Sequence, residues 1–303
     1  MTNPPVCNYE GSDYQQSFWE QGGRAYEDAA EAIALKRMLP AGGKLMLELG
    51  AGAGRNTPRY DGFERIVVLD YSTTQLAQAQ ERLGRSSKYI YVAADVYHLP
   101  FRAGLFDAAT MIRVLHHMAD APKALAQIQA ALRPGAVFIL EFANKLNLKA
   151  ILRYLLGRQA WSPFTLEPVE FVRLNFDFHP KAIRQWLGSL GFNIEATRTV
   201  SHFRLGLLKR LVPASLLAAL DGLFQPTGGV WQLTPSVFVK AKLPGKAALE
   251  IPVKVIELFK CPECDSGNLQ DKSNHVSCPF CGAEWSVNGG IYDFRERRNG
   301  VGG

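Results

Sequence analysis

The sequence predicts an α/β fold in which helices cover both faces of a mostly parallel sheet, with a second, smaller module towards the C-terminal end. Three observations predict it. Stretches with strand and helix character alternate between residues 45 and 141, joined by short links. A glycine-rich turn at residues 50–54 follows the first strand. Two C-x-x-C pairs lie at residues 261–264 and 278–281, with thirteen residues between them. Such alternation is typical of parallel sheets built from strand–helix–strand units.

The elements can be taken in chain order. Apolar residues at helical spacing predict a first helix over residues 17–39, which ends at the Pro-Ala-Gly-Gly run of residues 40–43. The run Ile66–Leu69 is apolar without interruption, as in a strand buried on both faces. Further helices are expected at residues 73–83, 121–132, 148–156 and 180–190, and within 203–224. Strands are expected at residues 45–49, 66–69, 89–93, 106–112, 136–141, 192–199 and 236–242.

The expected division of the chain is a large domain over residues 1–245 and a small one over 253–298. Two apolar and basic segments, at about 145–175 and 203–224, interrupt the second half of the large domain. They follow strands of an open parallel sheet, at positions where substrate lids belong, so we expect helical lid insertions there.

The composition is that of an ordinary globular protein: 303 residues, 47% hydrophobic and 20% charged. No apolar run reaches the ~20 residues of a spanning helix, and the N-terminus lacks the pattern of a secretion signal. Four of the five cysteines are paired as metal ligands, which together with one free thiol leads us to expect a cytoplasmic protein. The net charge of +6 is concentrated in residues 145–210, with eleven basic and four acidic residues. This segment is either a solvated face or a surface for an anionic partner.

The glycine turn lets a ligand approach the backbone closely, because Gly50, Gly52 and Gly54 have no side chains to block it. A dinucleotide site requires G-x-G-x-x-G, whereas the third glycine here comes one position early. Glu48, just before the turn, would repel phosphate and suits a cationic ligand such as S-adenosylmethionine. Asp70 ends the second strand, where it can accept hydrogen bonds from ribose hydroxyls. Asp95 follows the third strand, where it can accept a hydrogen bond from the adenine amino group.

At this point the chain resembles the class I S-adenosylmethionine-dependent methyltransferases, over residues 45–142. The motifs that carry the resemblance are Leu47–Arg55, Val68–Ser72, Asp95–Phe101, Phe106-Asp107 and Leu132–Gly135. Their order is most similar to the type 11 branch that includes quinone-biosynthesis methyltransferases. The resemblance implies a Rossmann-like sheet of seven strands with the last one antiparallel. It also implies cofactor contacts from residues of the turn, of the next two strand ends, of the segment after the fourth strand and of the first helix: Glu48, Gly50, Ala51, Gly52, Gly54, Asp70, Tyr71, Asp95, Val96, Arg113, Leu115, Arg24 and Tyr26.

The segment after the fourth strand reads Arg113-Val-Leu-His-His-Met118, without the Asn-Pro-Pro-Tyr run of amide-nitrogen methyltransferases. Transfer from an activated sulfonium depends mainly on alignment, so a base is needed only when the acceptor must lose a proton. His116 and His117 are weak candidates for such a base. The alternative is that the pair packs against the pocket or caps the strand end.

The four cysteines Cys261, Cys264, Cys278 and Cys281 supply the sulfur ligands of a structural Zn²⁺ site. A module of about fifty residues has a small core, so the metal would stabilise much of its fold. The redox alternative does not explain the matched second pair. Residues 256–262 and 289–294 resemble the small zinc-ribbon activator subunit of RNA and translation-factor methyltransferases, which implies an activator fused to its enzyme.

The sequence thus predicts a methyltransferase that uses S-adenosylmethionine, yields S-adenosylhomocysteine and carries its own zinc ribbon. The apolar insertions favour a small-molecule or lipid-like acceptor, with possible peripheral membrane contact through residues 145–224. The ribbon and the basic excess favour the alternative, an RNA- or protein-directed enzyme. A non-catalytic cofactor-binding scaffold is the third reading.

Overall fold

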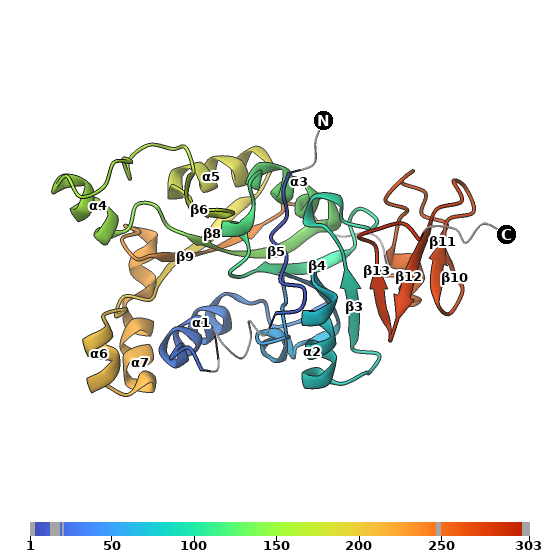
Figure 1. Ribbon diagram of the computed structural model, residues 1–303, viewed down its shortest axis with the longest axis horizontal. Helices are drawn as coiled ribbons and strands as arrows, with labels where there is room; N and C mark the ends of the chain where they lie inside the picture. Colours follow the sequence, from blue (N-terminus) through green and yellow to red (C-terminus); the bar gives the residue numbers. More distant parts are fainter. Residues whose placement is uncertain (1–3, 13–18, 20, 247–249, 299–303) are drawn as a thin grey trace.

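The computed structural model describes residues 4–12, 19, 21–246 and 250–298. One sheet of eleven strands runs through this part of the chain, in the order β10-β11-β12-β13-β3-β2-β1-β4-β5-β9-β8 (Figure 1). Seven strands form its larger half: β1 Gly43–Leu49, β2 Phe63–Asp70, β3 Tyr89–Ala93, β4 Phe106–Met111, β5 Leu132–Ala143, β8 Asn193–Val200 and β9 Ser236–Lys242. Strand β9 runs antiparallel to both β5 and β8, whereas the pairs among β1 to β5 are parallel. The expected antiparallel last strand is confirmed.

Helices cover both faces of the seven strands (Figure 1). Helices α3 Ala121–Ala131 and α5 Pro180–Ser189 pack on one face, against a core that includes Leu47, Val67 and Phe138. Helices α1 Ala25–Met38, α2 Thr73–Leu83 and α7 Ala214–Phe224 pack on the other. Alternate residues of each central strand are buried on opposite faces, as the continuous apolar runs predict.

Helix α1 begins at Ala25, not at residue 17 as the periodicity predicts. The physical reason is Gly23, whose φ of 63° lies in the left-handed region that a helix cannot include. Residues 21–23 form a turn instead. Of the expected first part of the helix, residues 17, 18 and 20 lie outside the described residues.

The strands of the C-terminal module continue the sheet of the large domain. These strands are β10 Gln270–Asp271, β11 His275–Ser277, β12 Glu284–Asn288 and β13 Ile291–Asp293. Strand β13 pairs in parallel with β3, with Tyr292 opposite Val92 (Figure 1). The apolar core also crosses this boundary, since Phe259 packs on Phe101 with ring centroids 5.8 Å apart. Sheet and core are therefore continuous between the large domain and the ribbon.

The expected insertions form helices at the end of the molecule opposite the ribbon (Figure 1). Helix α4 spans Leu148–Leu155, and α6 Gly206–Leu211 precedes α7. The first insertion is not helical throughout, because it also leads into a hairpin of β6 Val169–Val172 and β7 Asn175–Asp177. Short 3-10 turns complete the described secondary structure: η2 Thr57–Tyr60, η3 Val96–His98, η4 Leu115–His117, η5 Gln225–Gly229 and η6 Val255–Leu258. None of the helices in the described residues is both long and apolar enough to cross a bilayer.

Candidate functional site

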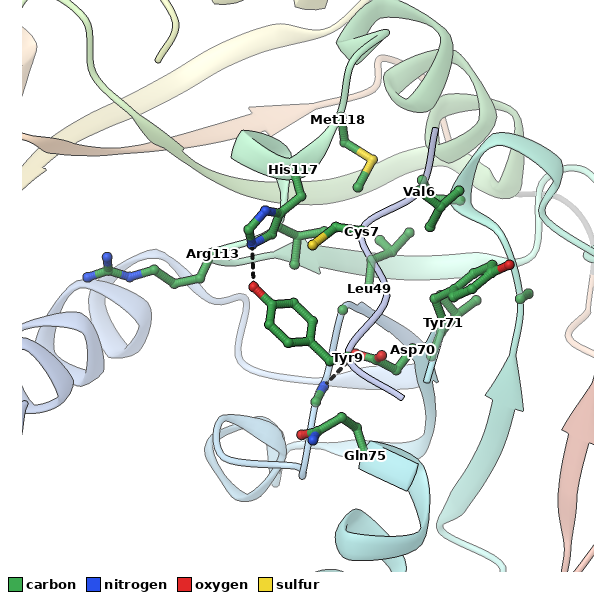
Figure 2. Close-up of a pocket in the computed structure, with 16 residues that line it drawn as sticks. Val6, Cys7, Tyr9, Leu49, Asp70, Tyr71, Gln75, Arg113, His117 and Met118 are labelled. Atoms are coloured by element: carbon green, nitrogen blue, oxygen red, sulfur yellow. Dashed lines mark hydrogen bonds between the residues drawn. The ribbon is translucent and has the colours of Figure 1, made fainter. Parts of the chain in front are cut away.

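A pocket opens at the carboxyl ends of β1 to β4, where open parallel sheets bind ligands (Figure 2). Its cavity is about 110 Å³. Each of the four strands contributes the residues that directly follow it, and the N-terminal segment and α2 complete the wall. The lining consists of Val6, Cys7, Tyr9, Leu49, Gly50, Gly52, Leu69, Asp70, Tyr71, Gln75, Ala94, Val96, Arg113, Val114, His117 and Met118.

The glycine turn forms the floor of this pocket. Gly50 has a φ of 63°, and a Cβ there would lie 2.1 Å from the Val114 side chain. Gly52 has a φ of 54°, and its backbone N–H donates to Asp70 Oδ2 at 2.8 Å. Only glycine meets both the steric and the backbone requirement at residue 50. The turn is thereby held against the end of β2.

Two polar side chains face the pocket from the β2–α2 connection. Asp70 accepts from Gly52 N–H and Ser72 N–H, and burial nonetheless raises the pKa of its carboxyl. Gln75, in the first turn of α2, has a buried Oε1 that accepts no hydrogen bond from the part of the chain that the structure describes. A buried acceptor without a partner is uncommon in a native protein and points to a donor that a ligand would bring. A ligand with hydroxyl or amino groups therefore fits this side of the pocket.

His117 lines the opposite side. Its Nδ1 lies 3.0 Å from the carbonyl of Leu174, at the turn of the β6–β7 hairpin, and its Nε2 lies 3.1 Å from the Tyr9 hydroxyl. A carbonyl can only accept, so Nδ1 carries the proton and Nε2 accepts from Tyr9. Burial lowers the pKa of His117, so the ring is neutral at pH 7. His116 does not line the pocket.

Six of the cofactor residues expected from the sequence come together here: Gly50, Gly52, Asp70, Tyr71, Val96 and Arg113. Arg113 adopts a φ of 62°, rare for a residue with a side chain, and its backbone N–H donates to Glu141. Strain of this kind clusters at functional sites. It fixes the direction in which the chain leaves β4.

The structure does not bring the other expected residues to the pocket wall. Glu48 lies beneath the turn, 3% exposed, and accepts from the Thr57 hydroxyl at 2.6 Å. The side chain of Asp95 caps η3 by accepting from Tyr97 N–H. Three more residues near the turn and strand ends are absent from the lining: Ala51, Gly54 and Leu115.

The two residues expected from the first helix also lie elsewhere. Tyr26 is buried and donates to Asp221 of α7 at 2.6 Å, and it accepts from the backbone N–H of Phe203. Arg24 pairs with Glu27. Tyr26 therefore connects α1 to α7, Arg24 pairs within the first turn of α1, and neither side chain lines the pocket.

The sequence reasoning missed the N-terminal wall of Val6, Cys7 and Tyr9. No local pattern marks these residues, since their place depends on contacts with parts of the chain more than sixty residues away. Gln75 could have been found, because it lies in the first turn of a helix that follows the motif strand directly.

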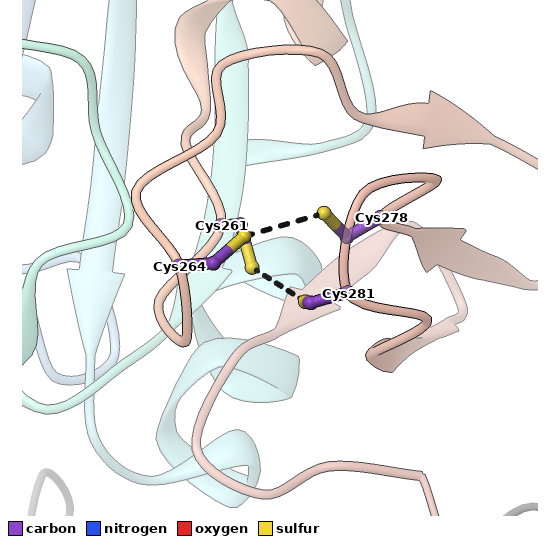
Figure 3. A group of neighbouring side chains, drawn as sticks. All are labelled: Cys261, Cys264, Cys278 and Cys281. Atoms are coloured by element: carbon purple, nitrogen blue, oxygen red, sulfur yellow. Dashed lines mark hydrogen bonds between the residues drawn. The ribbon is translucent and has the colours of Figure 1, made fainter.

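The second candidate site is the group of four cysteines (Figure 3). Their sulfur atoms all lie within 4.8 Å of one another, with 3.6 Å between Cys261 and Cys281 and 3.7 Å between Cys264 and Cys278. Tetrahedral zinc with Zn–S bonds of about 2.3 Å requires sulfur separations of about 3.8 Å. The spacing is too wide for disulfides. The ligand set and its geometry fit structural zinc.

Comparison with known proteins agrees with this picture. The model of the methyltransferase domain family matches residues 47–140. O-methyltransferase cnsE of Penicillium expansum is 28% identical over 151 residues, which cover 46% of this chain and 54% of that protein. The 2-phytyl-1,4-naphtoquinone methyltransferase of Nostoc punctiforme is 32% identical over 123 residues, which cover 38% and 54%. The chain thus spans about half the length of these curated relatives.

Two solved structures are similar over most of the chain. One is a chain of the complex between the Haloferax volcanii Trm112 methyltransferase activator and a putative methyltransferase, with a TM-score of 0.53, 15% identity and coverage of 78% of this chain and 96% of that one. The other is a putative S-adenosylmethionine-dependent methyltransferase of Listeria monocytogenes, with a TM-score of 0.52, 18% identity and coverage of 73% and 99%. The fold is the α/β, Rossmann-like methyltransferase fold.

Proposed function

We propose that this protein is an S-adenosylmethionine-dependent methyltransferase. The observation that carries the proposal is where the pocket lies. Most of its wall comes from residues 49–118, within the region that matches the methyltransferase domain family. The names of the curated relatives support the same reaction class.

The pocket residues fit such a cofactor. Asp70 and the partnerless Gln75 Oε1 supply acceptors for hydroxyl and amino groups, and Val96 and Tyr71 supply apolar surface for a ring. The close backbone approach at Gly50 and Gly52 leaves room along the turn. When bound, the cofactor supplies a methyl group already activated by its sulfonium. Contacts from the residues that do not line the pocket in this structure stay predictions.

The contribution of the protein to catalysis would be mainly alignment, which can supply about 7–11 kcal/mol of barrier reduction. His117 is the candidate base if the acceptor must lose a proton, because its ring is neutral and its Nε2 carries the lone pair. Tyr9 occupies that lone pair in this structure, so the hydroxyl would have to move before the histidine could act.

For the acceptor, we favour a small or lipid-like molecule. Two relatives are named as acting on quinones, the 2-phytyl-1,4-naphtoquinone methyltransferase and a demethylmenaquinone methyltransferase. The insertions beside the sheet expose apolar side chains, which an apolar acceptor could contact. The second candidate is an RNA- or protein-directed enzyme with a built-in activator, and the Trm112 complex among the similar structures favours it.

These two candidates differ in their response to salt. Binding of a polyanion weakens steeply with ionic strength, because it releases counterions, whereas binding of an apolar acceptor changes little. The test measures binding of the protein to RNA and to a quinone at 50 and 200 mM salt. Binding to RNA that weakens steeply over this range favours the RNA-directed enzyme, and binding to the quinone that stays constant favours the small-molecule enzyme.

Peripheral contact with a membrane is part of the proposal. The surface concerned consists of α4, α6, α7 and residues 230–233. The backbone N–H of Leu148 in α4 donates to the carbonyl of Leu233, which joins α4 to residues 230–233. Several of its apolar side chains are more than half exposed, including Leu155 at 68%, Leu211 at 73% and Trp231 at 59%. Residues 145–160 and 203–235 contain one acid, Asp221, which is fully buried. Apolar side chains among bases without exposed acids are what an anionic bilayer binds.

Vesicle sedimentation tests this surface. We expect binding to vesicles of phosphatidylcholine with phosphatidylglycerol, weaker binding to phosphatidylcholine alone, and a loss of at least tenfold when Leu155 and Leu156 are both changed to Glu. The matched control is Val253→Glu, because Val253, at the start of the C-terminal module, is 88% exposed. Equal binding of the double variant, or a concentration-dependent dimer that the double variant abolishes, would contradict the membrane assignment.

Calorimetry with S-adenosylhomocysteine tests the proposed function itself. The wild type should bind it, and Asp70→Ala should bind roughly ten- to a hundredfold more weakly, from the loss of one or two hydrogen bonds to a charged acceptor. Asp61→Ala, in an exposed turn, is the control. No heat of binding with the wild type, or an unchanged affinity in Asp70→Ala, would refute the site.

A further inference from the structure

The N-terminal segment of residues 4–12 forms part of the pocket wall, as Figure 2 shows: it runs past Asp70 and His117, with Tyr9 pointing at the histidine ring. Three of its residues face the cavity, and Tyr9 is hydrogen-bonded across it to His117. A ligand that filled the pocket would be enclosed by this segment. What holds the segment in place therefore bears on how the pocket opens and closes.

The first fastening is at the start of α2. The carboxylate of Glu10 accepts from the backbone N–H groups of Thr73 and Thr74, at 3.1 and 3.0 Å, and from both of their hydroxyls. Gln75 Nε2 donates to the carbonyl of Ser12 at 3.1 Å. These threonine amides are among the first N–H groups of the helix, which have no partner within it, and a negative charge is favourable there.

The second fastening comes from the ribbon. Arg295 donates from Nη1 to Glu10 Oε2 at 2.9 Å and to the carbonyl of Tyr71 at 3.0 Å. Its Nε and Nη2 donate to the Asp293 carboxylate at 2.9 and 2.7 Å. Tyr71 lines the pocket directly after Asp70. One side chain of the ribbon thus connects the N-terminal segment, the end of β2 and the end of β13.

Both Glu10 and Arg295 are charged at neutral pH, which strengthens the hydrogen bond between them. Hydrogen bonds from Thr73, Thr74 and Arg295 outweigh burial and lower the pKa of Glu10 to about 2, so its carboxylate stays ionised throughout the neutral range. Hydrogen bonds with Asp293 and Glu10 raise the pKa of Arg295. A bidentate arginine is also geometrically specific, which lysine is not.

The position of Arg295 depends in turn on the folded ribbon. Asp293 is the last residue of β13, and Phe294 packs on Trp285 and Phe259, with ring centroids 5.7 and 4.9 Å apart. Phe259 lies two residues before the first cysteine of the cluster, and Cys261 is buried in the same core. Loss of the metal would loosen this packing and with it the guanidinium.

We propose that the ribbon closes the cofactor pocket: Arg295 is a positioning residue that fastens residues 4–12 over the pocket, so that retention of the cofactor depends on the metal-holding module. The inference rests on the proposed cofactor, but the fastening itself does not. Cys7 lies in the fastened segment, half-buried and facing the cavity, and it is the one cysteine outside the cluster. Its thiol therefore reports opening without any ligand.

The experiment measures alkylation of Cys7 in the zinc-loaded protein, followed by intact mass. In Arg295→Ala we expect Cys7 to react roughly tenfold faster than in the wild type, and S-adenosylhomocysteine to bind roughly tenfold more weakly by calorimetry, the effect of losing about one charge-assisted hydrogen bond. Arg297→Ala is the matched control, since Arg297 is exposed two residues further along. Glu10→Ala should reproduce both effects from the side of the segment, with the ribbon unaltered. Removal of zinc by a chelator should weaken binding by at least as much as Arg295→Ala.

The outcomes separate the two proposals. If the wild type does not bind S-adenosylhomocysteine, the proposed function fails, and the alkylation rates alone decide whether Arg295 fastens the segment. If the wild type binds but Arg295→Ala and Glu10→Ala match it in both measurements, the inference is overturned and the function stands. If Arg295→Ala loses zinc or no longer unfolds cooperatively, the test depends on Glu10→Ala alone. Faster alkylation of Cys7 in Glu10→Ala then supports the inference, and an unchanged rate overturns it.

Discussion

The burial of Glu48 makes the stability of this fold depend on pH in a way that one substitution should remove. Burial raises the pKa of Glu48 to about 7, against the opposing effects of the Thr57 hydroxyl and of Arg55 and Arg59. In the unfolded chain its pKa is near 4.5. The folded state therefore binds a proton that the unfolded state releases between these two values. Protonated Glu48 contributes stability that is fully present below pH 4.5 and is lost as the pH rises to about 7.

The size of the effect follows from the pKa difference. Because one pKa unit corresponds to about 1.4 kcal/mol, the ionised carboxylate is disfavoured in the folded state by roughly 3 kcal/mol. Glu48→Gln keeps an oxygen that can accept from Thr57 and cannot ionise. Relative to the wild type, its free energy of unfolding should therefore increase by roughly 2–3 kcal/mol between pH 5 and pH 8. Other titrating groups change both proteins alike and cancel in this difference.

Urea unfolding at pH 5, 6, 7 and 8 provides the measurement, with Glu64→Gln as the control because Glu64 is exposed on β2. The control should run parallel to the wild type at every pH. A difference between Glu48→Gln and the wild type that stays constant from pH 5 to pH 8 would show that Glu48 has an ordinary pKa, and would refute the reasoning. No cofactor is needed, so this result stands apart from the proposed function.

Two further predictions concern the ribbon. Cys264→Ser should release zinc and unfold residues 261–294, seen as less than stoichiometric zinc by mass spectrometry and as selective loss of amide protection, and full zinc loading of the variant would exclude Cys264 as a ligand. Phe259→Ala should lower the free energy of unfolding by about 3–5 kcal/mol, because it leaves a cavity between the ribbon and Phe101 in the large domain, whereas Phe280→Ala, at 81% exposure, should stay within about 0.5 kcal/mol. Similar losses in both phenylalanine variants would show that the shared core does not connect the two parts.

The sequence predicts the sheet well because its signals are local. The run Ile66–Leu69 predicts a strand buried on both faces, and it lies inside β2. The glycine turn and Asp70 meet because both follow neighbouring strands, whose carboxyl ends share an edge. The four cysteines meet because two knuckles at this spacing need only one hairpin between them, which β10 and β11 form.

What the sequence does not reveal depends on pairings between distant segments. Strand β13 has three residues, and nothing in Ile291–Asp293 indicates that its partner is β3, some two hundred residues earlier. The place of residues 4–12 depends on the first turn of α2 and on Arg295, far along the chain. Tyr26 shows the reverse case: the family resemblance implies a contact with the cofactor, but its hydroxyl donates to Asp221 in α7.

The position of the ribbon also answers a structural need of the large domain. Without it, β3 would be the edge of the seven-stranded sheet, and an open edge leaves backbone groups unpaired and prone to association with other strands. Strand β13 covers that edge along Tyr91–Ala93, and the chain continues from Ala93 into Ala94 and Val96 of the pocket. Phe294 directly follows β13 and extends the pairing with β3, because its N–H donates to the carbonyl of Ala93. Loss of order in the ribbon would therefore affect the pocket in two ways, through the end of β3 and through Arg295. A metal that only stabilises the fold of the ribbon would in this way still affect how tightly the pocket retains its cofactor.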